Sequence, residues 1–239
     1  MPATVEFLPE SGAPSLLFLL FHGVGLDADA MRPLAEPLVA EYPQAAVVSI
    51  NAPHAYEGPT SGRPGYQWFS PVGIDDATRR DRVRAALPEF VAVVRSLTAR
   101  FGLPWQHTAL AGFSQGAVMA LEAVQAEPNL AGRVLAFGGR HATLPEHAPV
   151  DTTVHLFHGM ADTVIPHGPA VEAAKRLVTL GGDVTADVLP GISHELHPLL
   201  VDKAIGQLRT FVPRKVWEAA MREAPLMSRP ASSTELGGD

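Results

Sequence analysis

Short runs of apolar residues recur along the chain, separated by segments whose apolar residues lie three or four positions apart. Most of the short runs are continuous rather than alternating with polar residues, which is typical of strands buried on both faces of a sheet. The runs predict strands at 15–21, 45–50, 108–111, 133–137, 152–157 and 184–189.

The segments between these strands predict helices. In the longest segment, Val83, Leu87, Phe90, Val94 and Leu97 recur at steps of three and four, the spacing of a helix that buries one stripe of its surface. The predicted helices span 28–42, 76–101, 114–127, 168–181 and 198–212. Strands that alternate with helices indicate an α/β fold with a mainly parallel central sheet and helices on both faces.

One segment outside this alternation is rich in glycine and proline and spans 51–73. Its turn-forming residues are interrupted by the aromatic side chains of Tyr56, Tyr66, Trp68 and Phe69. Aromatic residues in a loop of this length favour an ordered, functional loop over a solvated linker.

The second exception is the tail at 213–239. It begins with a pattern that places Val216, Trp217, Ala220 and Met221 on one side of a short helix, and it ends in a stretch rich in serine and glycine. We therefore expect a single domain over 1–212, followed by a tail that is first helical and then disordered.

Composition narrows the classes of function. The chain has 239 residues, 46% of them hydrophobic, and a formal net charge of -7, which argues against a nucleic-acid partner. It contains no cysteine, which excludes disulfides, thiolate metal sites and a cysteine nucleophile. The N-terminus lacks the positive charge of a signal peptide, and the apolar run at 16–21 is too short to span a bilayer. We expect a soluble, cytoplasmic protein, with monomer and homodimer both left open.

The pentapeptide at 112–116 has the form G-x-S-x-G, with Ser114 at its centre. It joins a predicted strand to a predicted helix, which is the setting of a nucleophile elbow, the sharp turn that exposes a catalytic serine. Glycine is needed on both sides because a Cβ atom at Gly112 or Gly116 would collide with the neighbouring strand or helix. The plainer alternative is a serine that caps an ordinary helix.

A serine hydroxyl needs a histidine base and an orienting carboxylate, in the chain order Ser, Asp or Glu, His. Asp162 directly follows the predicted strand at 152–157, and His194 directly follows the strand at 184–189. Both positions lie at strand carboxyl ends, the edge where Ser114 is expected. Other candidates rank lower because of their places in strands or loops: His107, His155, His167, Asp183 and Asp187.

An oxyanion formed during acyl transfer needs two backbone N–H donors. One is expected from Gln115, which follows the nucleophile. The other is expected from the glycine-rich turn at 22–25, where we assign Val24 and rank Gly25 and Leu26 lower. We expect no metal, because the ten histidines form no pattern with an obvious ligand set.

Taken together, the segments 21–25, 112–117, 158–166 and 191–194 resemble the phospholipase/carboxylesterase family, which includes acyl-protein thioesterases and small bacterial esterases. The resemblance implies an α/β-hydrolase fold and an esterase or thioesterase without a metal or organic cofactor. It implies Ser114, Asp162 and His194 as the triad and Val24 and Gln115 as oxyanion donors.

The segment at 66–69 is similar to the family's loop beside the acyl pocket, so that Trp68 and Phe69 are candidates for substrate contact, with loop packing as the alternative. The sequence departs from the family at Leu26, where many members have aspartate, and beyond Pro213, where the tail has no counterpart.

We therefore expect a serine carboxylesterase or thioesterase that hydrolyses small to medium acyl substrates through an acyl-enzyme. The alternatives are another hydrolase on the same fold, such as a lipase, lactonase or peptidase, and a catalytically silent protein that binds a ligand in the same place.

Overall fold

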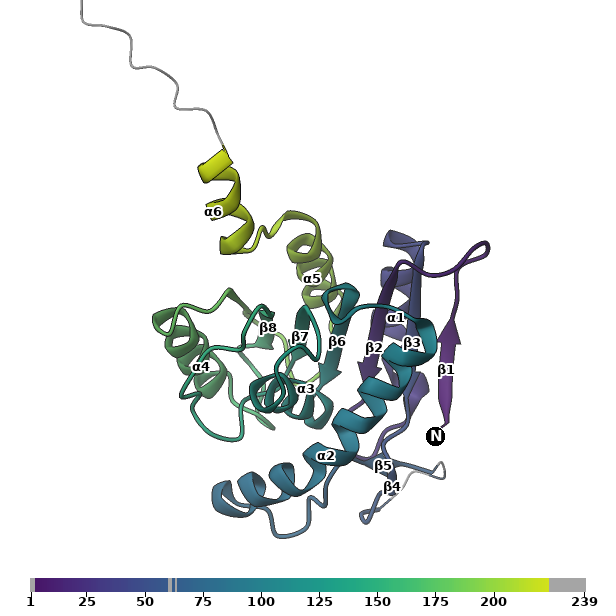
Figure 1. Ribbon diagram of the computed structural model, residues 1–239. Coiled ribbons are helices and arrows are strands. Elements are labelled where there is room, and N and C mark those ends of the chain that lie inside the picture. Colours follow the sequence, from purple (N-terminus) through teal and green to yellow (C-terminus); the bar gives the residue numbers. More distant parts are fainter. Residues whose placement is uncertain (1–2, 60–61, 63, 224–239) are drawn as a thin grey trace, which may run out of the picture.

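The computed structural model describes residues 3–59, 62 and 64–223. Its centre is a seven-stranded sheet in the order β1-β3-β2-β6-β7-β8-β9 (Figure 1). The strands of this sheet are β1 (Thr4–Phe7), β2 (Leu16–Phe21), β3 (Ala45–Ile50), β6 (Thr108–Phe113), β7 (Arg133–Phe137), β8 (Thr153–Gly159) and β9 (Val184–Leu189). All pairs are parallel except β1 with β3. The six predicted strands are confirmed, and β1 is an addition.

Helices occupy every segment predicted to be helical. They are α1 (Arg32–Glu41), α2 (Asp76–Phe101), α3 (Gln115–Ala126), α4 (Gly168–Thr179), α5 (Pro198–Thr210) and α6 (Arg214–Glu223), with the 3-10 turns η1 (Ala28–Met31) and η2 (Trp105–His107). The predicted helix at 28–42 is divided into η1 and α1. Pro33 stands at the start of α1, where its missing N–H leaves no helical hydrogen bond unmade.

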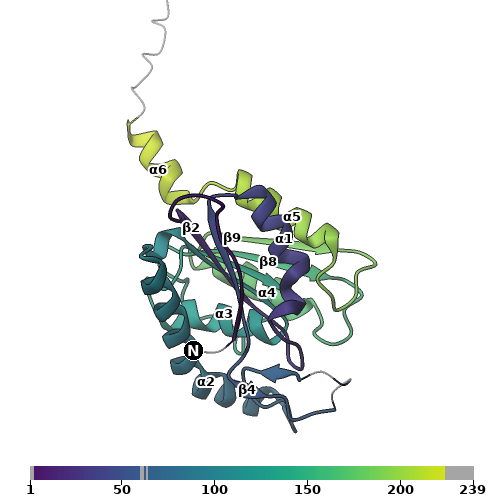
Figure 2. The ribbon, with the colours of Figure 1, turned by 90° about the vertical axis from the view of Figure 1, so that its right-hand side faces the viewer.

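Helices cover both faces of the sheet, as the sequence predicts (Figure 2). On one face α2 and α3 bury apolar side chains such as Phe90 and Leu121 against the strands. On the other face α1 and α5 do the same through residues such as Leu34 and Leu200. Because the strands are buried on both sides, they read as continuous apolar runs in the sequence.

The loop at 51–73 folds back over the carboxyl edge of the sheet. It contains two short strands, β4 (His54–Ala55) and β5 (Tyr66–Gln67), which pair antiparallel. Tyr66 also bridges to Leu26, in the segment after β2. The prediction of an ordered loop is confirmed for the described part of this segment.

Helix α6 lies at the opposite edge of the sheet from β4 and β5 (Figure 1). Its first amide, on Arg214, donates to the carboxylate of Asp183 at 3.1 Å, and Lys215 forms an ion pair with Asp151. A helix occupies the predicted position, and Trp217 on it is exposed. The predicted disordered end of the tail, from residue 224, lies outside the described residues.

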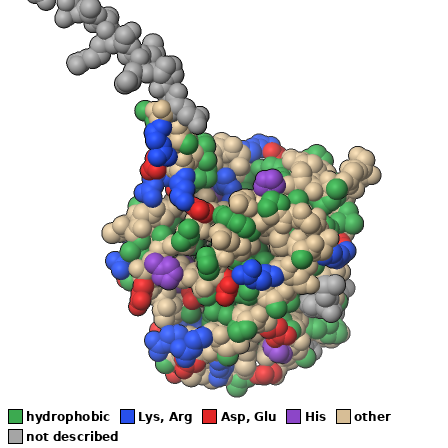
Figure 3. Space-filling model, in the orientation of Figure 1, with side chains coloured by type: hydrophobic (Ala, Val, Ile, Leu, Met, Phe, Trp, Pro, Cys, Tyr) green, Lys and Arg blue, Asp and Glu red, His purple; other side chains and the backbone are tan. Residues whose placement is uncertain are grey.

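Acidic and basic side chains are interspersed on the face of the molecule shown in Figure 3. Among the residues that the structure describes, no helix is both long enough and apolar enough to cross a membrane.

His155 in β8 is a fully buried histidine with a structural role. Its Nε2 atom lies 3.0 Å from the Arg133 guanidinium and its Nδ1 atom 2.8 Å from the Thr185 hydroxyl. Because a guanidinium only donates, Nε2 accepts and Nδ1 carries the proton. Burial, together with the charge on Arg133, lowers the pKa of His155 to about 3.

We expect this histidine to make the protein less stable in acid. In the unfolded chain, His155 becomes protonated below its ordinary pKa of 6.5. In the folded protein it stays neutral until the pH falls to its lowered pKa of about 3. The free energy of unfolding is therefore constant above pH 6.5 and falls as the pH drops from 6.5 towards 3. Between pH 7 and pH 5 this loss amounts to about 2 kcal/mol. Urea unfolding at pH 7 and pH 5 measures this decrease in the wild-type protein and in His155→Gln. The decrease should be smaller in His155→Gln by about 2 kcal/mol, and equal decreases would contradict a lowered pKa for His155.

Candidate active site

Ser114 lies in the turn between β6 and α3, as the motif predicts. Its backbone has φ 53° and ψ -116°, a left-handed conformation that a non-glycine residue adopts only when the surroundings enforce it. Its amide donates to the carbonyl oxygen of Phe137 at 2.9 Å, which ties the turn to the end of β7. This geometry is that of a nucleophile elbow.

Both glycines of the elbow are required by close backbone contacts. A Cβ atom at Gly116 would lie 2.1 Å from the carbonyl oxygen of Phe21, and one at Gly112 would lie 2.4 Å from the amide nitrogen of Ala117. Such contacts are far inside van der Waals distance, so α3 can approach the strands only with glycine there. The prediction made from the motif is confirmed at both positions.

The three predicted triad residues meet at the carboxyl edge of the sheet. The Nε2 atom of His194 lies 2.9 Å from the Ser114 hydroxyl oxygen, and its Nδ1 atom lies 2.7 Å from Oδ2 of Asp162. Since an ionised carboxylate only accepts, Nδ1–H donates to Asp162 and Nε2 is left to accept from the serine hydroxyl. The three side chains form a continuous chain of hydrogen bonds.

The carboxylate of Asp162 is held by its own loop. Burial raises its pKa, but hydrogen bonds from His194 and from the amides of Ile165 and Val164 outweigh this effect, so that the pKa lies below its ordinary value. Oδ1 accepts from these amides at 2.8 and 2.9 Å respectively, which leaves Oδ2 for His194. The carboxylate is therefore ionised and oriented near neutral pH.

His158, at the end of β8, fastens the same loop. Its Nε2–H donates to the carbonyl oxygen of Ile165 at 2.7 Å and lies 3.3 Å from Oδ2 of Asp162. Burial lowers the pKa of His158, so the ring is neutral near neutral pH. His158 opens the motif that contains Asp162, but no local pattern in the sequence predicts its contact with that carboxylate.

The turns that carry Asp162 and His194 pack against each other in close backbone contact. A Cβ atom at Gly159 would lie 2.1 Å from the carbonyl oxygen of Ile192, and the amide of Ala161 donates to that oxygen at 3.0 Å. The His194 ring also packs on Phe113, with 4.9 Å between centroids. These contacts fix the imidazole over the elbow.

The predicted oxyanion donors belong to two segments that adjoin Ser114, the turn at 22–25 and the first residue of α3. The amide of Gly25 donates to Tyr66 and that of Leu26 to Gly23, so neither is available to a substrate. Within the described part of the chain, the amide of Val24 has no acceptor. Gln115 opens α3, where the helix provides no partner for its amide.

Gly23 brings this turn against the nucleophile. A Cβ atom at Gly23 would lie only 3.2 Å from Cβ of Ser114. The next amide, that of Val24, is therefore close to the reacting hydroxyl. The departure at Leu26 leaves this turn intact, since its amide closes the turn at 3.2 Å from the Gly23 carbonyl oxygen.

His22 fixes the direction of the Val24 amide. Its Nδ1–H donates to the carbonyl oxygen of Gly23 at 2.7 Å, while Nε2 accepts from the amide of Ala52 at 2.9 Å. The Gly23 carbonyl and the Val24 amide belong to one planar peptide, so holding the oxygen also holds the N–H. Burial lowers the pKa of His22, which keeps this pattern of donor and acceptor.

The predicted substrate contacts are not supported by the packing. Trp68 is 2% exposed and Phe69 is 7% exposed, and both belong to the core beneath the loop. The Trp68 indole lies edge-on to Phe21 and Phe90, with centroids 5.5 and 5.3 Å apart, and donates Nε1–H to the carbonyl oxygen of His22 at 2.9 Å. The alternative of loop packing describes both rings better, because both are buried in the core and the indole N–H of Trp68 finds its acceptor inside the protein.

The lower-ranked candidates lie elsewhere. Asp187 accepts from Gln207 at 2.9 Å, Asp183 caps α6 through Arg214, and His155 is bonded within the sheet. None of these three contacts Ser114 or His194 in the described structure.

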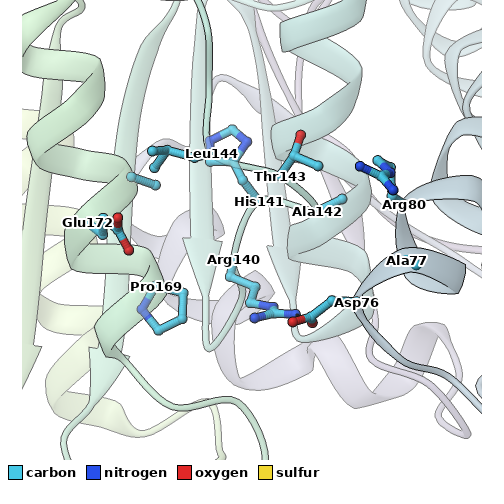
Figure 4. A pocket seen from close by; sticks show the side chains of 11 residues that line it. Asp76, Ala77, Arg80, Arg140, His141, Ala142, Thr143, Leu144, Pro169 and Glu172 are labelled. Carbon is cyan, nitrogen blue, oxygen red and sulfur yellow. The ribbon is translucent and has the colours of Figure 1, made fainter.

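A cavity of about 280 Å³ lies between the first turns of α2 and α4 and the loop after β7 (Figure 4). It is near the candidate site, because Arg140 follows Gly138 by two residues and a Cβ atom at Gly138 would lie 3.3 Å from the His194 ring. Arg140 binds Asp76 at 2.5 Å, and Arg80 and Glu172 add one charge of each sign. The lining is therefore mixed in charge and does not select one class of ligand.

The chain is similar to known esterases over most of its length. The model of the phospholipase/carboxylesterase family matches residues 6–212. The chain is 41% identical over 213 residues to the esterase YpfH of Escherichia coli (strain K12), covering 89% of this chain and 90% of that protein. It is 24% identical to acyl-protein thioesterase 1 of Eremothecium gossypii, covering 80% of this chain and 86% of that protein.

Solved structures show the same architecture. The crystal structure of esterase PE8 has a TM-score of 0.79 at 30% identity and covers 88% of this chain and 99% of that one. Acyl-protein thioesterase 2 of Zea mays has a TM-score of 0.68 at 19% identity, covering 87% and 98%, which shows a common fold. The sheet, the motifs and these matches together show that this chain has the α/β-hydrolase fold and belongs to the phospholipase/carboxylesterase family.

Proposed function

We propose that this protein is a serine hydrolase that cleaves carboxylic ester or thioester bonds of small to medium acyl substrates. The observation that carries the proposal is the chain of hydrogen bonds from the Ser114 hydroxyl through His194 to Asp162, at 2.9 and 2.7 Å. Its position at a nucleophile elbow, beside two backbone amides free to bind an oxyanion, supports acyl transfer.

In the first half of the reaction, the Ser114 oxygen attacks the substrate carbonyl carbon while its proton passes to Nε2 of His194. The ionised Asp162 stabilises the imidazolium that results. The carbonyl oxygen becomes negative, and in this mechanism the amides of Val24 and Gln115 donate to it. His194 then returns the proton to the leaving alcohol or thiol as its bond to carbon breaks, and an acyl-enzyme remains.

In the second half, water takes the place of the leaving group. His194 removes a proton from the water, the resulting oxygen attacks the acyl carbon, and the same amides hold the second oxyanion. The bond to Ser114 breaks, the serine oxygen recovers its proton from His194, and the carboxylic acid leaves. These steps use the side chains and backbone amides of this chain together with the substrate and water.

Residues 1–212 form one catalytic domain, and residues 213–239 are an appended tail. This division is supported by the end of the family match at residue 212 and the start of α6 at Arg214.

The predicted cytoplasmic location is tested by following esterase activity in fractionated cells.

Substrate class is tested with matched p-nitrophenyl esters and acyl thioesters, from acetyl to dodecanoyl, together with lactones and p-nitroanilides. We expect saturable hydrolysis of esters or thioesters, fastest for short and medium acyl chains, and no cleavage of anilides. Cleavage of anilides or lactones alone would assign a different reaction to the same fold, and no turnover of any substrate would favour a silent binding protein.

A further inference from the structure

The side chain of Gln115 is bonded at both ends to a loop far away in the sequence. Its Oε1 atom accepts from the amide of Trp68 at 2.8 Å, and its Nε2 atom donates to the carbonyl oxygen of Phe69 at 2.7 Å. Gln115 is 6% exposed, so these bonds are shielded from water. The loop after β5 is thereby held against the first residue of α3.

The same loop holds the turn at 22–26 that carries Val24. Tyr66 accepts from the amide of Gly25 at 2.8 Å and donates its own amide to Leu26 at 2.9 Å. Trp68 donates its indole N–H to the carbonyl oxygen of His22 at 2.9 Å. The turn is therefore fastened at both of its ends, with Val24 between them.

These bonds connect three segments around the candidate oxyanion site: the start of α3, the loop after β5 and the turn at 22–26. The Gln115 side chain binds the backbone of Trp68 and Phe69, and their loop binds the turn at 22–26. That turn, which carries Val24, packs against Ser114 through Gly23. Gln115 is thus linked to both candidate donors, to one through its own backbone and to the other through the loop that its side chain binds.

We propose that the Gln115 side chain and the Trp68 indole are positioning residues that set the spacing between the two oxyanion donors. This inference rests on the proposed serine hydrolase function. It gives Trp68 a role at the site without contact to the substrate, which agrees with its burial. The pair acts on the transition state, because the distance between the donors matters most when the carbonyl oxygen has become negative.

The test compares Gln115→Met and Trp68→Phe with the wild-type enzyme. Methionine nearly preserves the volume of glutamine and removes both hydrogen bonds, whereas phenylalanine preserves an aromatic ring and removes only the indole N–H. Loss of a whole oxyanion donor costs about 10²–10³ in kcat, so a displaced donor should cost about tenfold to a hundredfold in Gln115→Met. We expect a loss of about threefold to tenfold in Trp68→Phe, with KM nearly unchanged in both variants.

Two readouts separate positioning from general support of the loop. The inhibition constant of a trifluoromethyl ketone, whose adduct resembles the tetrahedral intermediate, should rise by the same factor as kcat/KM falls. The pH dependence of kcat/KM should not move, because His194 and Asp162 keep their contacts. A fall in activity with an unchanged inhibition constant, or with a displaced pH profile, would overturn the proposal.

Gln125→Met is the matched control, since Gln125 lies on the same helix and also donates to a loop carbonyl, that of His147, at 2.6 Å. Trp105→Phe, at the opposite edge of the sheet, is the control for the indole. Both should retain wild-type kcat/KM.

The outcomes distinguish the two proposals. If Ser114→Ala is inactive but Gln115→Met and Trp68→Phe keep wild-type kcat/KM, only the positioning role is refuted. Activity that survives Ser114→Ala would refute the proposed function instead. If Gln115→Met fails to fold, Trp68→Phe decides between these outcomes.

Discussion

Replacing Ser114 by alanine should reduce kcat/KM for a p-nitrophenyl ester by a factor on the order of 10⁴ or more. The hydroxyl lies 2.9 Å from Nε2 of His194, and without it the enzyme loses its nucleophile and any covalent intermediate. The oxyanion donors are unchanged, so a weak residual rate is expected from binding and electrostatic stabilisation alone.

The same substitution should leave the fold intact. Alanine has a Cβ like serine, so the strained backbone at φ 53° is no worse accommodated, and the lost hydrogen bond is partly exposed. Thermal unfolding and near-UV circular dichroism provide the check. Undiminished turnover by folded Ser114→Ala would show that another group is the nucleophile.

Replacing Asp162 by asparagine should reduce kcat by about 10⁴ at neutral pH. The asparagine oxygen can still accept from the amides of Val164 and Ile165, so the loop should persist. The amide nitrogen, however, would stand where Oδ2 now accepts from His194 at 2.7 Å. It would donate to Nδ1, move the imidazole proton to Nε2, and so remove the acceptor for the serine proton.

A matched control for this prediction is Asp187→Asn, since Asp187 is bonded to Gln207 in the described structure. Steady-state kinetics should show full activity in the control and the large loss in Asp162→Asn, with similar unfolding midpoints. Equal activities in the two variants would contradict the orienting role of Asp162.

The fold and the reacting groups could be predicted from the sequence because both follow from regular patterns. Continuous apolar runs identify strands buried on two faces, and the carboxyl ends of parallel strands converge on one edge. Ser114, Asp162 and His194 each follow such a run directly, which makes their meeting predictable without any knowledge of loop geometry. Strands β1, β4 and β5 lacked this signal because they are short and because, apart from the buried polar residue Gln67, their residues are only partly buried or exposed.

The positioning contacts could not be predicted because they join loops that are distant in the sequence. Gln115 and Trp68 are separated by 47 positions, and His22 and Ala52 by 30. Whether an aromatic residue in a loop faces the substrate or the core depends on whether its polar atom finds a buried acceptor. For Trp68 that acceptor is the His22 carbonyl oxygen, and no local pattern in the sequence reveals it.

Labelling the protein with a fluorophosphonate and locating the adduct by peptide mass spectrometry shows whether Ser114 is the nucleophile of an acyl-enzyme reaction. We expect one adduct on the peptide that carries Ser114, formed in parallel with loss of esterase activity and absent from Ser114→Ala. No adduct, or an adduct on another residue, would contradict it.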